Sequence, residues 1–193
     1  MLPYVNYEMR IFSIVVVIFY FNICHANSFG TETGLDLPRY VSLKSNNSNL
    51  RVGPSKNYPI AIKYIVSNFP LKIIEEYEDW RRVEDLEKNN GWIHKSLIKG
   101  ERYGIVVSSD NSKVKLFNVV NGKIVGEINA GALVYISKCK INWCLIKIKN
   151  HKGWVRKDNI WGVKKEEIFN INIFQEIIDY YMHSINFFFE KLN

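Results

Sequence analysis

Two cysteines are the residues of this chain most able to react with each other. Cys139 and Cys144 are five positions apart, with Trp143 between them. If this segment is the turn of a hairpin, the two strands bring the Cβ atoms within the roughly 3.5 to 4.5 Å that a disulfide requires. We therefore predict a disulfide, with two buried free thiols as the alternative. A zinc site is disfavoured, because His151 is the only histidine nearby.

The other reactive residue types form no recognisable catalytic set. His94 and His151 have no cysteine nucleophile and third orienting group in register with them. The sequence also lacks a glycine-rich phosphate loop, a serine elbow and paired carboxylates in a supporting context. We expect a protein that is not an enzyme, that uses no cofactor and no metal, and that acts by binding.

Aromatic and basic side chains supply the chemistry of a binding surface. Tyrosine and tryptophan offer a large contact area with a polar edge, and arginine adds charge. The predicted ligand-binding residues are Arg51, Tyr58, Trp80 and Trp92. The alternative is that the tryptophans pack inside the fold, and that the basic set of Arg51, Arg81, Arg82 and Lys95 is a solvated strand surface.

These residues belong to an internal repeat. Leu50, Leu71, Trp80 and Trp92 correspond to Val114, Leu133, Trp143 and Trp154, at offsets of 64, 62, 63 and 62 residues. Ordered landmarks at nearly constant spacing indicate a duplication. Each copy contains short β-rich runs separated by turn residues. The sequence therefore predicts a mainly β fold of two tandem small barrels, each of about five strands.

The first copy resembles the bacterial SH3-like (SH3b) domain. The resemblance rests on Leu50 to Pro59 (LRVGPSKNYP), on Trp80 to Val83 (WRRV) and on Gly91 to Leu97 (GWIHKSL). The second copy keeps the later half of the signature and is similar to the second module of tandem exported SH3-domain proteins of alphaproteobacteria. The resemblance implies a first SH3-like barrel at 37–100 and a second, degenerate one at 101–163. It also implies a ligand that varies among members, which bind peptidoglycan, peptides or proteins.

The N-terminal residues predict export. A basic start at Arg10, an apolar run over 11–21 and small residues at Cys24 and Ala26 fit a signal peptide over 1–26, cleaved between Ala26 and Asn27. An uncleaved anchor is the alternative, although the run is shorter than the roughly 20 residues of a spanning helix. Export implies a periplasmic or secreted protein, in which a disulfide can persist. Residues 27–36 are expected to be an unordered lead-in.

The C-terminal segment 164–193 predicts an amphipathic α-helix. Apolar residues from Phe169 to Leu192 recur every three or four positions, and acidic residues occupy much of the other side. The apolar side can pack on the barrels, on a partner or second copy, or on a membrane surface.

Composition limits the partners. The 193 residues include 26 Lys or Arg and 19 Asp or Glu, a formal net charge of +7. Such a charge attracts anionic envelope polymers or acidic lipids, and export argues against nucleic acid. We expect an exported, non-catalytic protein that binds cell-envelope material, either peptidoglycan or a wall-associated peptide. The alternative is a protein–protein interaction scaffold that uses the barrels and the C-terminal helix, with self-association through residues 164–193.

Overall fold

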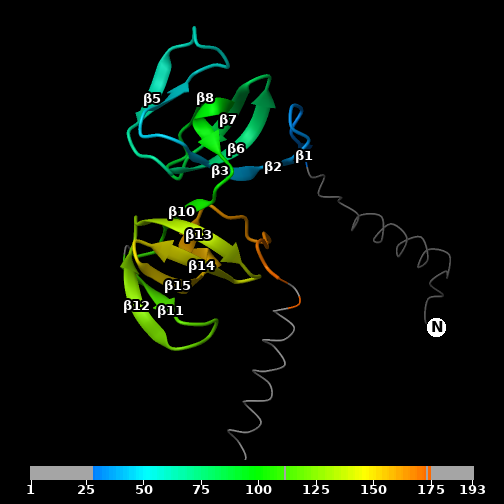
Figure 1. Cartoon of the computed structure of the whole chain (residues 1–193). Helices are drawn as coiled ribbons and strands as arrows, with labels where there is room; N and C mark the ends of the chain where they lie inside the picture. The colour runs from blue at the N-terminus through cyan, green and yellow to red at the C-terminus, as the bar shows by residue number, and fades with distance from the viewer. Residues whose placement is uncertain (1–27, 111, 173, 175–193) are drawn as a thin grey trace, which may run out of the picture.

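The computed structural model describes residues 28–110, 112–172 and 174. These residues form a mainly β protein with two seven-stranded sheets and one two-stranded sheet. Figure 1 shows the two large sheets as separate, curved bodies. We call them the first module (39–99) and the second module (103–161). The predicted signal peptide, its cleavage site and residues 175–193 lie outside the described residues.

The first module carries the strand order β5-β4-β8-β7-β6-β3-β9. A 3₁₀ turn at Lys95–Leu97 precedes its last strand. Seven strands form instead of the expected five, and one of them is the two-residue strand after this turn, which pairs with β3. The strands are β3 (Arg39–Leu43), β4 (Ser48–Arg51), β5 (Ile60–Tyr64), β6 (Pro70–Tyr77), β7 (Trp80–Glu84), β8 (Asn90–His94) and β9 (Ile98–Lys99).

The second module repeats this arrangement strand for strand, in the order β12-β11-β15-β14-β13-β10-β16. Its 3₁₀ turn is Lys157–Asn159. The common order shows that the repeat in the sequence is also a repeat in the fold. The strands are β10 (Tyr103–Val106), β11 (Lys113–Phe117), β12 (Ile124–Asn129), β13 (Leu133–Cys139), β14 (Trp143–Ile148), β15 (His151–Arg156) and β16 (Ile160–Trp161).

Each module encloses its own hydrophobic core. Leu43, Leu50, Ile73, Val83 and Ile93 are fully buried in the first core. Strand residues alternate between this core and the outer face, so Val83 points inward while its neighbours Arg82 and Glu84 are less buried. Burial of one face fixes the register of the strands, and therefore which side chains reach the surface.

The lead-in at 27–36 is not unordered, which corrects the prediction from sequence. Residues 28–37 form a hairpin of β1 (Ser28–Phe29) and β2 (Asp36–Leu37). The turn docks on Glu76, whose carboxylate accepts hydrogen bonds from the backbone N–H groups of Glu32 at 3.0 Å and Thr33 at 2.9 Å, and from Thr33 Oγ1 at 2.8 Å. The partner of this short polar segment lies far along the chain, so local composition gave no sign of it.

Residues 164–172 are not helical either, so the predicted helix does not begin at Lys164. Phe169 instead forms a β-bridge with Cys139, with both N–H···O distances at 3.2 Å. The Lys157 ammonium, on a residue that is 5% exposed, donates to the carbonyls of Lys165 and Glu167 at 3.0 and 2.8 Å. These carbonyls pair with the buried cation and so hold the segment in an irregular conformation.

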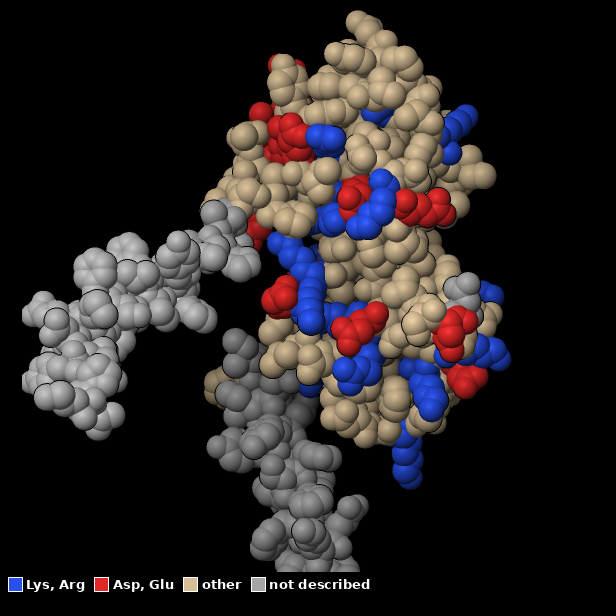
Figure 2. Space-filling model, turned by 180° about the vertical axis from the view of Figure 1, so that it is seen from behind, with Lys and Arg blue, Asp and Glu red and all other residues tan. Residues whose placement is uncertain are grey.

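Aromatic and polar contacts join the two modules. Tyr40 of the first module meets Trp161 of the second edge to face, with ring centroids 5.3 Å apart. The Tyr103 N–H donates to Ser42 Oγ at 3.2 Å, and the Arg102 guanidinium lies 5.8 Å from the centre of the Tyr40 ring. Arg102 also forms an ion pair with Glu167. Figure 2 shows acidic and basic side chains next to one another over both modules on this side of the molecule.

No helix in the described part of the chain is long and apolar enough to cross a membrane.

Candidate functional site

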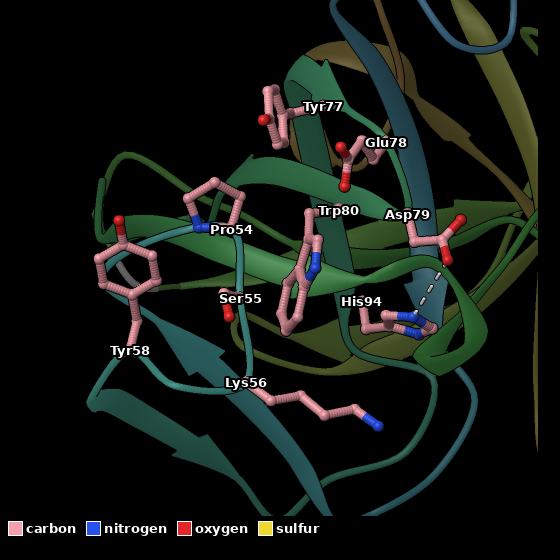
Figure 3. Close-up of a pocket in the computed structure, with 9 residues that line it drawn as sticks. All are labelled: Pro54, Ser55, Lys56, Tyr58, Tyr77, Glu78, Asp79, Trp80 and His94. Atoms are coloured by element: carbon pink, nitrogen blue, oxygen red, sulfur yellow. Dashed lines mark ion pairs between the residues drawn. The ribbon is translucent and has the colours of Figure 1, made fainter.

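An open groove of about 640 Å³ lies on the first module (Figure 3). The β4–β5 loop, the β6–β7 turn and the end of β8 form its walls. Its lining combines three aromatic rings with charged groups of both signs: Pro54, Ser55, Lys56, Tyr58, Tyr77, Glu78, Asp79, Trp80 and His94.

Trp80 is the centre of this groove. It stands opposite His94 in the β7–β8 register, and the two rings meet edge to face at 5.3 Å. Figure 3 shows the indole between the loop at Pro54–Lys56 and the His94 ring. Because Val83 faces the core and alternation places Trp80 on the outer side of the sheet, the indole can be packed at one edge and still line the groove.

Hydrogen bonds to backbone carbonyls of the β4–β5 loop hold this loop in place. Arg51 Nη1 donates to the Tyr58 carbonyl at 2.6 Å, and the Val52 N–H donates to the Pro59 carbonyl at 3.1 Å. The Tyr58 ring lies so close to Gly53 that a Cβ there would be 2.7 Å from it. Glycine at position 53 therefore allows the loop to fold back under Tyr58.

Acidic and basic side chains lie at different ends of the groove. Asp79 lies beside Lys95 at 2.7 Å and His94 Nε2 at 3.9 Å, and the Lys95 ammonium holds the pKa of the Asp79 carboxyl below its usual value. Figure 3 shows Glu78 and Asp79 on one side of Trp80 and Lys56 on the other. The groove thus offers an acceptor end, an aromatic centre and a cationic end.

The His94 ring is held in one tautomer. Its Nδ1 accepts the Ser96 N–H at 3.3 Å and lies 2.7 Å from Ser96 Oγ. An Nδ1 that accepts leaves the proton of the neutral ring on Nε2, which faces Asp79. His94 is therefore a positioned donor within the groove.

A second hollow of about 220 Å³ adjoins the groove and shares Lys56, Trp80 and His94 with it. Arg51, Asn49, Ser96 and Leu97 complete its lining. Asn49 Oδ1 is buried without a hydrogen-bond partner among the described residues. Together the two hollows extend across Trp80, which suits a chain-like ligand better than a compact one.

The structure brings three of the four predicted ligand-binding residues to these hollows. Tyr58 and Trp80 line the groove, and Arg51 lines the second hollow. Trp92 lines neither of the two, and its ring meets Tyr77 edge to face at 6.4 Å. The sequence indicated Tyr77 only as part of an amphipathic tyrosine surface, and the predicted ligand-binding residues did not include Lys56, Asp79 and His94. Two features could have indicated Asp79 and His94 as groove residues. Asp79 lies in the turn before Trp80, and His94 pairs with Trp80 in the strand register.

The basic set expected in the first copy does not form a cationic patch. Arg81 is 5% exposed and lies 3.4 Å from Glu76. Arg82 pairs with Glu75 at 3.1 Å and Lys95 pairs with Asp79 at 2.7 Å. Carboxylates therefore neutralise three of the four residues, and only Arg51 remains next to the groove.

In the second module, the Phe117 side chain occupies the place that is equivalent to the groove of the first module. Phe117 pairs with Trp154 as Arg51 pairs with Trp92, so Phe117 stands where the first module has Arg51. The Phe117 ring meets Trp143, the counterpart of Trp80, edge to face at 5.2 Å. The Arg156 guanidinium lies 5.8 Å from the centre of the same indole. Phe117 and Arg156 thus pack against Trp143, although the two indoles are equally buried, each 8% exposed.

The two cysteines of the second module are paired across the β13–β14 hairpin as a disulfide, with Cα atoms 4.1 Å apart. Both are fully buried in the core of this module.

Comparison with protein families gives a match to the bacterial SH3 domain over residues 44–100 and 120–162. A search of curated proteins found no match. Similar solved structures are NlpC2 and NlpC1 from Trichomonas vaginalis and an NlpC/P60 family protein from Bacillus cereus ATCC 10987.

These structures are distant in sequence and in overall shape. They are 12%, 14% and 10% identical to this chain, with TM-scores of 0.29, 0.30 and 0.27. The alignments cover 70%, 75% and 63% of this chain, but 51%, 52% and 55% of the three solved chains. The protein therefore spans about half the length of these structures, and at such TM-scores the alignments support no functional argument.

Proposed function

Because this chain belongs to the bacterial SH3 domain family, we propose that it is an exported binding protein whose first module holds a cell-envelope peptide, in peptidoglycan or attached to the wall, in the groove over Trp80. Each module is then an SH3-like barrel. The observation that carries the proposal is the groove itself: the exposed rings of Tyr58 and Tyr77 lie there beside Lys56 and the outer edge of the largely buried Trp80.

The chemistry of the groove fits a peptide. The rings of Tyr58, Tyr77 and Trp80 provide contact area for a short chain, and aromatic residues dominate many binding hot spots. Lys56 can pair with a ligand carboxylate, and the Glu78 and Asp79 end can accept hydrogen bonds from an amine or amide. A wall peptide carries both kinds of group, so the order of charges along the groove gives the bound chain a direction.

The protein acts by binding, without catalysis, in the periplasm or outside the cell. An interaction scaffold that uses the C-terminal segment is the alternative function. The exposed rings of Tyr58 and Tyr77 support the first function, because both line the groove of the first module.

Cosedimentation of the chain with purified peptidoglycan tests the proposal. We expect Tyr58→Ala, which removes a ring that is 47% exposed, to weaken retention about tenfold, and Lys56→Gln to weaken it in a salt-dependent way. Ile65→Ala is the matched control, because Ile65 is an exposed side chain of the same module outside the groove. Unchanged retention of both groove variants would contradict the proposal.

A chain that ends at Phe174 separates the two functions. This end point keeps residues 164–170, which pack on the second module. Retention by this shorter chain supports recognition by the groove, whereas retention that requires residues 175–193 supports the scaffold.

A further inference from the structure

The outer face of β13, β14 and β15 in the second module carries a set of lysines. Lys147 stands directly opposite Lys152, and Lys138 stands opposite Leu145, which pairs in turn with Trp154. Residues paired across strands share a face of the sheet, and so do residues two apart on one strand. Lys138, Lys147 and Lys152 therefore lie on one side, around Leu145 and Trp154. We call this surface the lysine face.

The lysine face has no internal neutralisation. Lys138, Lys147 and Lys152 have no carboxylate within ion-pair distance among the described residues. Residues 101–163 contain eleven Lys or Arg but four Asp or Glu, so few acids are available. Like charges directly opposite each other destabilise a sheet, and no described carboxylate forms an ion pair with Lys147 or Lys152 to offset this repulsion.

The first module shows what the same face looks like when it is neutral. Its register places Glu75 where the second module has Lys138, Glu84 where it has Lys147, and Asn90 where it has Lys152. The first module forms the ion pairs Lys72–Glu84 at 2.5 Å and Arg82–Glu75 at 3.1 Å on this face. Both acids are thus replaced by lysine in the second module.

Trp154 holds part of this charge in position. The ammonium groups of Lys138 and Lys140 lie 5.4 and 5.3 Å from the centre of its ring. A cation above an indole is attracted by the ring, so the Trp154 ring helps to fix where these ammonium groups lie. The face is therefore broad and cationic, in contrast to the groove of the first module.

We propose that the lysine face binds a phospholipid bilayer with anionic headgroups. A cationic sheet face can meet an extended layer of negative charge, to which each nearby lysine adds attraction. Exposed apolar side chains lie near the Lys138 end of this face, at the opposite end of β14 from Lys147 and Lys152: Ile141, 69% exposed, in the β13–β14 turn, and Ile168, 52% exposed, in the segment that pairs with β13. Phe174 is 79% exposed, and the sequence beyond it continues with periodic apolar residues.

This arrangement supplies what the C-terminal sequence lacks. Residues 175–193 contain three acidic residues and one lysine, so this sequence offers little attraction to anionic lipid by itself. The sheet provides the lysines, and the apolar residues provide contact with the acyl boundary. The second module would then attach the protein to a membrane surface, while the groove of the first module remains free.

Cosedimentation of the full chain with lipid vesicles tests the proposal. Vesicles of phosphatidylcholine alone measure the contribution of apolar segments, including residues 11–21, and vesicles that also contain phosphatidylglycerol add the charge. We expect tighter binding to the anionic vesicles, and the triple variant Lys138→Gln, Lys147→Gln, Lys152→Gln to weaken this binding roughly a hundredfold. Raising the salt concentration should weaken binding of the unaltered chain more than that of the variant.

A second triple variant separates the face from net charge. Lys44→Gln, Lys63→Gln and Lys88→Gln change three exposed lysines of the first module and remove the same total charge. Binding that is lost in the first variant and kept in the second supports the proposal. Equal effects of the two variants, equal binding to both kinds of vesicle, or binding of soluble polyphosphate without binding of anionic vesicles would overturn it.

Discussion

A single position shows how the two modules differ at the scale of residues. The Glu76–Arg81 pair of the β6–β7 hairpin occupies the register place that the disulfide Cys139–Cys144 occupies in the β13–β14 hairpin. Glu76 accepts hydrogen bonds from Arg39 at 2.5 Å and from the N-terminal turn, and its side chain is fully buried. A buried charge requires such partners, so this carboxylate orders the lead-in as well as the hairpin.

Acid should weaken the protein through this carboxylate. Burial would raise the pKa of Glu76, but the hydrogen bonds from Arg39, Thr33 and Glu32 outweigh it and hold the pKa below 4.5. A lowered pKa in the folded state gives stability that is present above the unfolded value and is lost as the pH falls through the folded value. We expect Glu76→Gln to lower the free energy of unfolding by about 3 kcal/mol at pH 7.

Denaturant unfolding at pH 7 and at acidic pH measures this effect. The difference between Glu76→Gln and the unaltered chain should shrink as the pH falls below the folded-state pKa of Glu76. Glu75→Gln is the matched control, because its side chain is 53% exposed and its pair with Arg82 contributes less than about 1 kcal/mol. A variant at position 76 that unfolds like the control would show that the buried charge does not stabilise the fold.

At the scale of elements, each module is completed by a segment from outside its sheet. The hairpin at 28–37 docks on Glu76 of β6, and the segment at 164–170 docks on Cys139 of β13, the equivalent position. In both modules an arginine at the beginning of the first strand of the sheet forms an ion pair at the docking site. Arg39, the first residue of β3, pairs with Glu76, and Arg102, just before β10, pairs with Glu167. The two ends of the folded region are therefore fixed by the same part of the repeat.

Reduction of the Cys139–Cys144 disulfide should destabilise the β13–β14 hairpin. The disulfide closes a short loop of sequence separation 5, for which the chain-entropy relation gives about 2 kcal/mol. We expect reductant to lower the free energy of unfolding of the unaltered chain by this amount. The double variant Cys139→Ser, Cys144→Ser should have the lower value in both conditions.

Denaturant unfolding with and without dithiothreitol makes this comparison, and thiol counting on the denatured chain checks the pairing. Stability that does not respond to reductant, together with reactive thiols at both positions, would mean that the two cysteines are free.

At the scale of the whole molecule, contacts near the linker set how the modules are arranged. Tyr40 and Trp161 join two otherwise separate cores, and Arg102 connects Tyr40 with the C-terminal segment. The groove on the first module and the lysine face on the second then keep a fixed relation to each other.

Removal of Trp161 tests this relation. We expect Trp161→Ala to allow the modules to reorient, because it deletes an aromatic contact worth roughly 1 kcal/mol beyond area burial. NMR relaxation should then give separate rotational correlation times for the two modules, whereas the control Ile65→Ala should keep a single one. A common correlation time for Trp161→Ala would show that the remaining contacts are sufficient.

The sequence by itself determined what depends on local pattern and on spacing. Alternating residues gave the strands, and the offsets between Trp80 and Trp143 and between Trp92 and Trp154 gave the two modules. The residues Arg51, Tyr58 and Trp80 were found as candidates because ring and charge types are visible in a sequence.

Only the tertiary structure decided which of these residues work together. Arg81 and Arg82 were unsuitable for a ligand because carboxylates on the partner strand neutralise them, and Trp92 lies beside Tyr77 instead of lining the groove. The order of residues 28–37, the irregular path of 164–172 and the contact of Phe117 with Trp143 also depend on partners far along the chain. Burial and charge pairing across such distances are set when the sheets fold, and no local pattern records them.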